Sequence, residues 1–463
     1  MRNELSEKAG CSKRESFANR RTAILAMAGS AIGLGNIWRF PYIVGEYGGG
    51  AFILVYVFCC FFLSMPIFIS ESVIGRATRK NTFGAMKELA PGSGWKWLGL
   101  LTVLTPMIIL SYYSVVGGWS VSYLMKSMAF DFTPENAGVV TGYFGDLVAA
   151  AWEPIIFMVV FLLLCAAIVF KGVKSGIERF SKLTMPVLFL LMIIIAVYSV
   201  SLPGAGAGIR YMLVPDFSKL TLDACVSALG QSFFSLSLGV GTMLTYSSYM
   251  SKDENLMASC GGTALSDLLF AMIAGFAIMP AVFAANIEPS SGPGLIFETL
   301  PYIFSSIGSG GRVLSGIVAI LFFVSVLVAA LSSAVSLMEV GVACLVEEKK
   351  VSRGAAIISI FVFCLVLGTL CSLSCGNMPG LRIRSKSVFD FCDKLCSNYL
   401  MTLGALLFCV FVGWKMKKTV VRDELTNHGV LRSGGKLFPL MYFMIRYVAP
   451  IVIAVIMLTS IFA

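Results

Sequence analysis

GSAIGLGN (residues 29–36) is a glycine-rich stretch in the middle of an apolar segment that is long enough to span a membrane, and SLSLGVG (residues 235–241) is its counterpart in a second such segment. A spanning helix must satisfy its own backbone hydrogen bonds, so an interruption at mid-membrane needs a structural reason. Close helix packing of the GxxxG kind is one interpretation of the glycines. The other is a helix that is unwound at mid-membrane to form a binding site.

The amino-acid composition predicts a protein that lies in a lipid bilayer. The chain has 463 residues, of which 57% are hydrophobic and only 13% are charged, too few polar residues to cover one aqueous globule. Apolar stretches of about 20 residues, the length needed to cross a hydrocarbon core, recur along nearly the whole chain. We expect eleven spans, at residues 22–45, 50–76, 97–126, 154–171, 177–203, 222–250, 258–287, 311–346, 354–374, 390–415 and 438–462.

The two interrupted spans are the first and the sixth, so each is the first helix in one of two successive sets of five spans. Matched interruptions in two halves are typical of transporters built from inverted repeats. In such sites the unwound carbonyls coordinate a cation, and half-helix N-termini direct amides at an anionic group, so an α-amino acid suits both. The expected organisation is an N-terminal gate segment, two repeats and an eleventh helix, at residues 1–21, 22–203, 222–415 and 438–463.

The positive net charge of +10 fits a membrane topology. With a cytoplasmic N-terminus, alternating loops place roughly two dozen of the 35 Lys and Arg inside, as the positive-inside rule requires. The first twenty residues lack an apolar run with a cleavage site, so we expect the first helix to be retained. We expect a multi-pass inner-membrane protein with Ala463 outside, and the charge gives no reason to invoke nucleic acid.

Cysteine and histidine offer no catalytic or metal centre. Most of the 13 cysteines lie in apolar runs, where a free thiol packs as a small apolar group. Four that flank an outer loop could form a disulfide of undetermined pairing: Cys371, Cys375, Cys392 and Cys396. The single histidine, His428, lies in a basic loop without metal-ligand partners. An enzyme would need a nucleophile with a base, or a metal, and the apolar spans offer neither.

Four segments together resemble the neurotransmitter:sodium symporters, the family that includes the bacterial leucine transporter. They are GSAIGLGNIWRFPYIVGEYGGGAF (29–52), KGVKSGIERF (171–180), QSFFSLSLGVGTMLTYSSY (231–249) and ALSSA (330–334). The resemblance covers almost the whole chain. It implies an all-α fold of two inverted five-helix repeats plus one extra helix, the eleven-helix type found in some bacterial members.

The resemblance implies one or two bound sodium ions, which prefer hard oxygen ligands. One site would use the carbonyls or hydroxyls of Gly29, Ile32, Ala329, Ser332 and Ser333. The other would use Ala31, Asn36, Ser235 and Asp267. Taken alone, the two serines of the first site could equally bond back to their own helix.

At the position of Asp267 the sequence differs from the bacterial leucine transporter, which has an asparagine there. A carboxylate in an apolar span is costly unless it is paired, and sodium is the obvious partner; a protonated or helix-capping aspartate is the alternative. Animal members of the family bind chloride near this sodium, and the position of their chloride-contacting serine is Ala271 here. We therefore expect transport without chloride.

The resemblance also places the substrate. Monoamine transporters carry an aspartate at the position of Gly33, whereas glycine leaves space for a substrate carboxylate. The mostly apolar lining suits a hydrophobic or aromatic amino acid, and Val240 and Ala334 are small enough for a large side chain. The expected substrate residues are Ala31, Gly33, Leu34, Gly35, Ile109, Tyr113, Phe234, Ser235, Ser237, Val240, Ser333, Ala334 and Leu337.

Gates and a hinge are implied in the same way. The outer gate pairs Arg39 with Asp393, and Tyr113 and Phe234 form the lid beneath it. The inner gate comprises Arg14, Glu347 and the plug Phe17, although Arg14 alone is also explained by topology.

Gly176 and Pro186, with nine residues between them, resemble a hinge in span 5. We expect the intramembrane acids Glu71 and Glu339 to bond to unwound backbone. The main prediction is a sodium-coupled amino-acid importer that works by alternating access, as a monomer. A sensor or channel on the same scaffold is the alternative.

Overall fold

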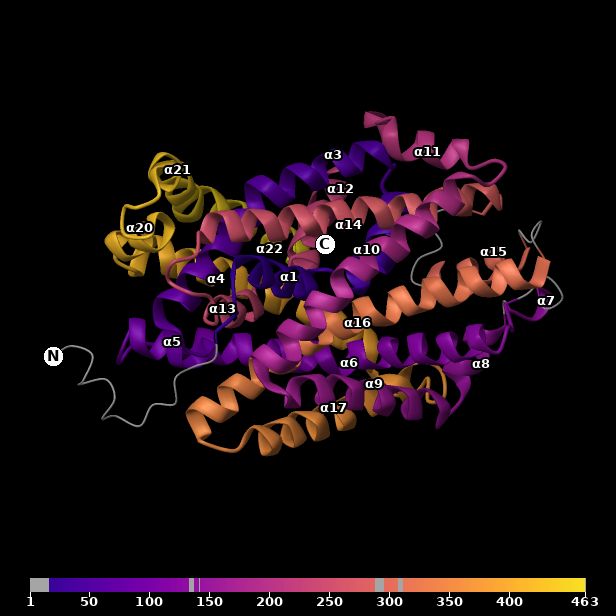
Figure 1. Cartoon of the computed structure of the whole chain (residues 1–463), viewed down its shortest axis with the longest axis horizontal. Helices are drawn as coiled ribbons and strands as arrows, with labels where there is room; N and C mark the ends of the chain where they lie inside the picture. Colours follow the sequence, from indigo (N-terminus) through magenta and orange to yellow (C-terminus); the bar gives the residue numbers. More distant parts are fainter. Residues whose placement is uncertain (1–15, 133–136, 141, 288–294, 307–310, 463) are drawn as a thin grey trace.

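The computed structural model describes residues 16–462 apart from 133–136, 141, 288–294 and 307–310. The described chain forms an elongated bundle whose long helices run roughly along its length (Figure 1). The short helices α5 (Thr82–Leu89) and α20 (Lys418–Thr426) lie at one end, and α7 (Ala137–Val140) and α8 (Tyr143–Ala149) lie at the other.

In the first half, a helix interrupted after α1 is followed by four long helices, several of which contain wide π turns. The remaining elements are α1 (Arg20–Ala31), η1 (Gly35–Arg39), α2 (Phe40–Glu46), α3 (Gly50–Phe58), η2 (Cys59–Ser64), α4 (Met65–Thr78), α6 (Lys96–Met128), α9 (Glu153–Phe170), η4 (Val173–Glu178), α10 (Arg179–Val200), α11 (Gly206–Leu213) and η5 (Phe217–Lys219).

The second half repeats this plan and adds a last helix. Its elements are α12 (Leu222–Ser235), α13 (Thr242–Ser247), α14 (Leu256–Ala284), η6 (Leu295–Thr299), α15 (Leu300–Ser306), α16 (Gly311–Lys349), α17 (Arg353–Cys375), β1 (Arg382–Ile383), β2 (Lys386–Ser387), α18 (Val388–Lys394), η7 (Leu395–Leu400), α19 (Met401–Val410), η8 (Phe411–Lys415), α21 (Arg432–Phe443), η9 (Met444–Val448) and α22 (Ala449–Phe462). The two short strands pair antiparallel as a hairpin before α18.

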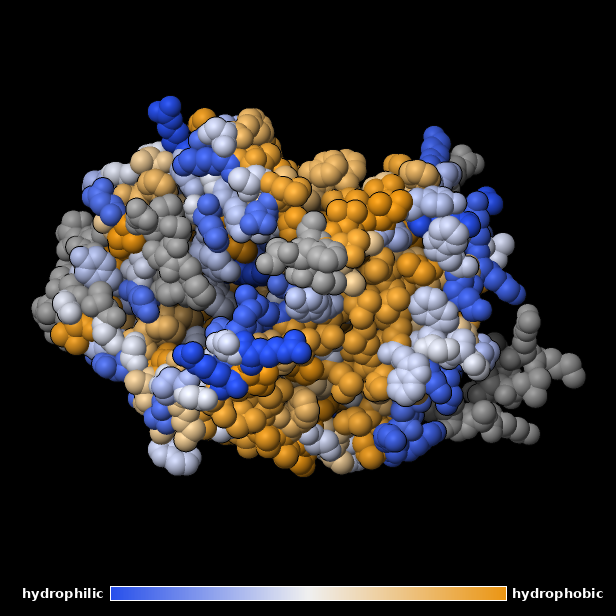
Figure 2. Space-filling view, turned by 180° about the vertical axis from the view of Figure 1, so that it is seen from behind, coloured by the Kyte–Doolittle hydropathy of each residue, from blue (hydrophilic) through white to orange (hydrophobic). Residues whose placement is uncertain are grey.

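The predicted number of spans is confirmed. Among the described residues, nine helices are long and apolar enough to cross a membrane, and the pair Arg20–Ala31 and Gly35–Glu46, bent by 55°, makes a tenth. With α12 and α13 as the halves of a second broken helix, the count reaches eleven. A broad hydrophobic band crosses the surface between two ends where hydrophilic residues gather (Figure 2).

Both glycine-rich stretches interrupt their helices. The first helix stops at Ala31, Ile32 is extended with φ −72° and ψ 106°, and winding resumes at Gly35. In the second break, Gly239 and Gly241 have φ of 80° and 72°. A Cβ on Gly239 would lie 2.0 Å from the Met401 carbonyl oxygen, so only glycine fits this approach.

Helix packing encloses these breaks. The 33-residue α6 is largely buried and packs against α16, α9 and α17, while α10 packs against α14 and α1. Helices α14, α10 and α16 pack against α1 and so hold the first broken helix within the bundle.

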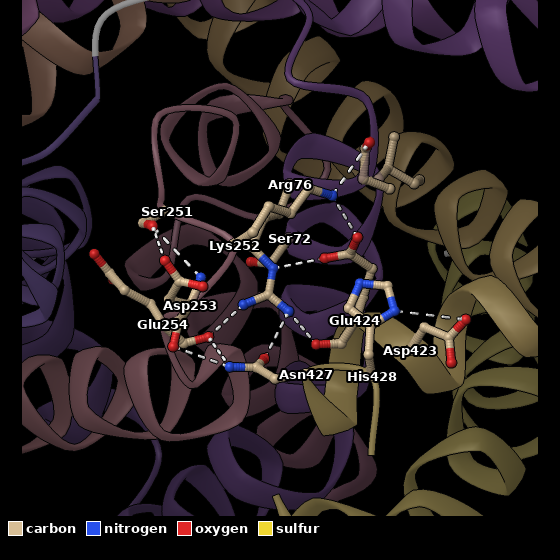
Figure 3. Close-up of polar contacts among 12 residues, drawn as sticks. Ser72, Arg76, Ser251, Lys252, Asp253, Glu254, Asp423, Glu424, Asn427 and His428 are labelled. Atoms are coloured by element: carbon tan, nitrogen blue, oxygen red, sulfur yellow. Dashed lines mark hydrogen bonds and ion pairs between the residues drawn. The ribbon is translucent and has the colours of Figure 1, made fainter. Parts of the chain in front are cut away.

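A buried arginine ties together three segments at the α20 end of the bundle (Figure 3). Arg76, 1% exposed at the end of α4, donates from Nε to Glu424 Oε2 of α20 at 2.6 Å, and its other nitrogens reach the Glu424 and Glu254 carbonyls and Asn427. Lys252 also pairs with Glu424, at 2.5 Å. The Glu424 carboxylate, together with the oxygens that accept from the guanidinium, compensates the burial of the Arg76 charge.

The cysteines and the histidine form no centre in the described part of the chain. Its twelve cysteines are all unpaired, including the four for which the sequence left a disulfide open. No group of three potential metal ligands occurs there, and His428 is exposed, with Asp423 4.0 Å away.

Candidate substrate and sodium sites

The breaks in the two interrupted helices face each other. The Ser237 hydroxyl donates to the Ser30 carbonyl at 3.2 Å, so the second break bonds directly to the first. The Ser333 hydroxyl of α16 donates to the same carbonyl at 3.1 Å. Phe234 packs so closely on Gly35 that a Cβ there would lie 2.9 Å from its ring. Backbone groups freed by both breaks therefore converge on one place.

A small cavity of about 30 Å³ lies at this meeting point. It is lined by Ala31, Gly33, Gly35, Ile109, Tyr113, Phe234, Ser237, Val240, Ser333, Leu337 and Met401. All but Met401 were predicted from the sequence as substrate residues. Met401 begins α19 and reaches the cavity only because that helix approaches Gly239, which no local motif in the sequence indicates.

Three predicted substrate residues lie beside the cavity. The Leu34 amide donates to the Tyr113 hydroxyl at 3.2 Å, which joins the first break to α6, and the Leu34 side chain lines the space outside. Ala334 is buried next to Ser333. Ser235 points instead to Asp267.

Asp267 is the centre of a fully buried polar cluster. Its Oδ1 accepts from the Asn36 amide nitrogen at 2.8 Å, and its Oδ2 accepts from the Ser235 hydroxyl at 2.7 Å. Asn36 also donates to Ser235 at 3.0 Å, and its amide oxygen accepts from the Gly33 amide at 3.1 Å. The carboxylate, hydroxyl and amide supply the hard oxygens that sodium prefers. Ala31, the remaining predicted ligand, lines the small cavity.

A second oxygen cluster joins α16 to the first break. The Ser332 hydroxyl lies 3.1 Å from the Ile32 carbonyl and 2.8 Å from the Ala329 carbonyl. The Ser333 hydroxyl lies 3.4 Å from the same Ile32 carbonyl. The two serines therefore bond across to the broken helix, and Ser332 also bonds back within its own helix.

Gly29, the remaining predicted ligand of this cluster, packs against α10. A Cβ on it would lie 3.2 Å from Ser181 and 3.6 Å from Met185. Helix α10 therefore covers this side of the second cluster.

The sequence also matches a known family, whose name agrees with a sodium site at this place. The model of the sodium:neurotransmitter symporter family matches residues 14–140 and 140–463. The chain belongs to this family.

Its relatives among known proteins are transporters. An uncharacterized sodium-dependent transporter of Bacillus subtilis is 36% identical, and the match covers 96% of this chain and 97% of the relative. An uncharacterized sodium-dependent transporter of Methanocaldococcus jannaschii is 31% identical, and the match covers 91% of this chain and 86% of the relative. The crystal structure of MhsT in complex with L-phenylalanine superposes with a TM-score of 0.88 at 40% identity, covering 97% of this chain and all of MhsT. The symporter is thus a sodium-dependent transporter with the family's fold of two inverted five-helix repeats, and not an enzyme.

Next to the small cavity, the symporter has a larger vestibule of about 560 Å³ whose lining includes the predicted outer-gate residues Arg39 and Asp393. The guanidinium of Arg39 stacks 5.0 Å from the ring centre of Phe234. In the described part of the chain no ion pair within 4.0 Å joins Arg39 to Asp393. Phe234 and Tyr113 line both the vestibule and the small cavity, so they separate the two spaces.

Phe17, the predicted plug of the inner gate, is buried between two tyrosines. Its ring makes edge contacts with Tyr246 and Tyr249 at 6.1 and 6.0 Å, and its amide donates to the Tyr249 carbonyl at 3.0 Å. Glu347 accepts from the backbone and side chain of Asn81 at 2.8 and 2.9 Å. Its predicted partner Arg14 lies outside the described residues.

The two other intramembrane acids differ in role. Glu71 accepts from the Gly239 amide at 2.6 Å, which confirms the prediction that it bonds to unwound backbone. For Glu339 the prediction was wrong, because its carboxylate pairs with Arg353 at 2.5 Å and accepts from Tyr249 at 2.8 Å. Arg353 lies at the start of the next helix, beyond the range of local sequence patterns.

The predicted hinge residues lie in one continuous helix. Gly176 is within the wide turn η4, where a Cβ would lie 2.2 Å from the Ile168 carbonyl oxygen, and Pro186 is inside α10. Proline lacks the amide that would bond to the carbonyl one turn earlier, which weakens α10 at that turn.

Proposed function

We propose that the protein is a sodium-coupled symporter that imports a hydrophobic or aromatic L-amino acid by alternating access. The observation that carries this proposal is the convergence of two helix breaks on one cavity, with two oxygen clusters that are linked to its lining through Gly33 and Ser333. Free amides and carbonyls there can bind the charged ends of an amino acid, and the clusters can take one or two sodium ions.

The cavity lining selects the substrate class. A Cβ on Gly33 would lie 2.3 Å from the Ser333 hydroxyl, so the position has no room for the aspartate that would bind a monoamine. The rest of the lining is mostly apolar and carries no charged side chain. The related MhsT was solved with L-phenylalanine, which supports an aromatic substrate here. A cavity of about 30 Å³ holds one water-sized molecule, so Phe234 and Tyr113 would move apart on binding.

Asp267 supports sodium coupling without chloride. In the family's chloride-dependent members an anion offsets the charge of the sodium, whereas here a carboxylate is already hydrogen-bonded among the proposed sodium ligands. The methyl group of Ala271, one turn along α14 and buried, offers no donor to an anion.

The sodium gradient would drive the cycle. Sodium at both clusters stabilises the outward-facing state, and its release on the inside commits the substrate to the cytoplasm. We place the N-terminus in the cytoplasm and the C-terminus outside, in a bacterial inner membrane, because that orientation puts most of the basic loops inside. We propose a monomer as the transporting unit.

Uptake of radiolabelled Trp, Tyr, Phe, Leu and Ala into proteoliposomes tests the proposal. An inward sodium gradient is compared with potassium, each with chloride or gluconate. Concentrative uptake of the aromatic substrates that needs sodium but not chloride is the expected result. Equal uptake in potassium would refute sodium coupling. Substrate binding without any uptake would favour a sensor, and downhill flux without accumulation would favour a channel.

A further inference from the structure

A second pocket, of about 680 Å³, lies away from the transport path where α20 meets α21 and η9. It is lined by Lys418, Thr419, Arg422, Phe438, Pro439, Tyr442, Phe443, Arg446 and Tyr447. Both α20 and α21 lie at the same end of the bundle as α5 (Figure 1). The lining holds three cations and no acidic side chain, so the pocket is suited to an anion.

The cations of this pocket are not neutralised by any of the described residues. In the part of the chain that the structure describes, Lys418, Arg422 and Arg446 form no ion pair within 4.0 Å. Glu424, on the same helix, is already engaged by Arg76 and Lys252. The Nε of Arg446 is buried, and no described residue accepts a hydrogen bond from it.

Aromatic rings hold two of the cations in place. The Arg446 guanidinium lies 4.6 Å from the ring centre of Trp414 and 5.4 Å from that of Tyr447. The Lys418 ammonium lies 5.3 Å from the ring centre of Tyr442. Stacking leaves the donors at the edge of the planar guanidinium available, and that edge matches the oxygens of a phosphate group.

The rim of the pocket belongs to the lipid-facing surface. Trp414 is 60% exposed and Phe443 is 52% exposed, and Arg446 lies within the apolar segment Lys436–Leu458, which is long enough to span a membrane. Trp414 lies one residue before the end of the span Val388–Lys415, and an exposed tryptophan at the end of a spanning helix is typical of the membrane interface. An anion with an apolar tail fits this surface better than a soluble one.

We propose that this pocket binds the phosphate headgroup of an anionic glycerophospholipid from the adjoining leaflet. Arg446, Arg422 and Lys418 contact the phosphate, and the acyl chains lie along Phe443 and Tyr447. Basic pockets beside spanning helices are a known means of headgroup recognition. Because α20 also carries Glu424, the partner of Arg76, a bound lipid would stabilise the link between the last helices and α4.

Native mass spectrometry of the purified, delipidated full chain tests the site, with phosphatidylglycerol, phosphatidylcholine or inorganic phosphate added. We expect retained phosphatidylglycerol on the wild type, little phosphatidylcholine, and a loss of about fivefold in affinity for each cation removed. The double variant Arg422→Gln/Arg446→Gln should therefore bind more than tenfold more weakly. The matched control is Lys96→Gln/Lys350→Gln, which removes the same charge outside the pocket and includes a lysine stacked 5.5 Å from Trp97.

Two results would overturn the proposal. An equal loss in the control pair would mean that overall surface charge, and not this pocket, retains the lipid. Displacement of phosphatidylglycerol by inorganic phosphate at equal concentration would make the pocket a site for a soluble anion. If the double variant does not fold, Arg422→Gln alone serves, since this side chain is exposed on α20, and unchanged binding in that variant would refute the site.

Discussion

The proposed independence of transport from chloride depends on one residue, Asp267. The substitution Asp267→Asn keeps the shape of the side chain but removes the negative charge that would face sodium. Two unit charges 4 Å apart interact by about 4 kcal/mol at an effective dielectric of 20, so even partial loss should weaken apparent sodium affinity at least about tenfold. Sodium-dependent uptake in proteoliposomes measures the change.

The companion substitution isolates the chloride effect. In Asp267→Asn/Ala271→Ser the remaining uptake should become dependent on chloride, whereas Ala271→Ser alone should transport as the wild type does in gluconate. Uptake that stays indifferent to chloride in the double variant would show that Asp267 does not take the place of the anion.

Ser332 tests the other oxygen cluster. Its hydroxyl lies within hydrogen-bonding distance of the Ile32 and Ala329 carbonyls, so Ser332→Ala removes one ligand of the proposed site. We expect the sodium concentration for half-maximal uptake to rise about tenfold, which corresponds to about 1.4 kcal/mol. The control is Ser325→Ala on the same helix, whose hydroxyl bonds only to the Leu321 carbonyl in the described contacts. Equal effects in both variants would assign the loss to helix stability.

At the scale of elements, Gly239 tests whether the second helix break is required. In Gly239→Ala the new methyl group would meet the Met401 carbonyl at 2.0 Å, in a backbone region that costs a side chain about 1–3 kcal/mol. We expect uptake to be abolished and thermal stability to fall. Gly230→Ala, within α12 and with open space around it, should leave both unchanged. Normal transport by Gly239→Ala would show that the break can adopt another shape.

Arg76 shows how differently a buried and an exposed ion pair act. Arg76→Met would leave Glu424 with Lys252 alone and would remove the donor of the buried Glu424 carbonyl, which should cost about 3–5 kcal/mol; the Glu254 carbonyl keeps Asn427 as a donor. Lys80→Gln breaks an exposed pair with Glu88 at 2.6 Å and should cost about 1 kcal/mol or less. Thermal unfolding in detergent compares them, and equal shifts would contradict the structural role of Arg76.

Long apolar runs made most of the spanning helices predictable from the sequence. An apolar run longer than a bilayer is a strong local signal, so the fifth span, predicted at 177–203, differs from the observed Val173–Val200 by only a few residues. Glycine clusters likewise located both breaks. The pairing of Glu339 with Arg353 and the approach of Met401 to the cavity depend on how distant helices pack, which no single segment encodes. The short hairpin 382–387 also lacks a strong local pattern.

At the scale of the whole molecule, the proposed cycle requires water to reach the second oxygen cluster from the inside. We propose that helix α10 closes that route, because its Ser181 and Met185 lie against Gly29. Pro186 directly follows Met185 and leaves a carbonyl of the preceding turn without its amide, so this is the turn of α10 that costs least to unwind. The proposed hinge therefore lies where opening would release sodium.

Pro186→Ala restores the missing amide and should make α10 harder to unwind. We expect the maximal rate of uptake to fall about tenfold while binding of substrate and sodium stays unchanged, because sodium release slows and the outward-facing site is untouched. Hydrogen exchange of α10 should slow in the same variant. Pro154→Ala is the control, since that proline occupies the first turn of α9, where no helical amide bond is lost. A wild-type rate with slower exchange would separate hinge opening from the transport cycle, whereas a weaker sodium affinity would mean that α10 shapes the site itself.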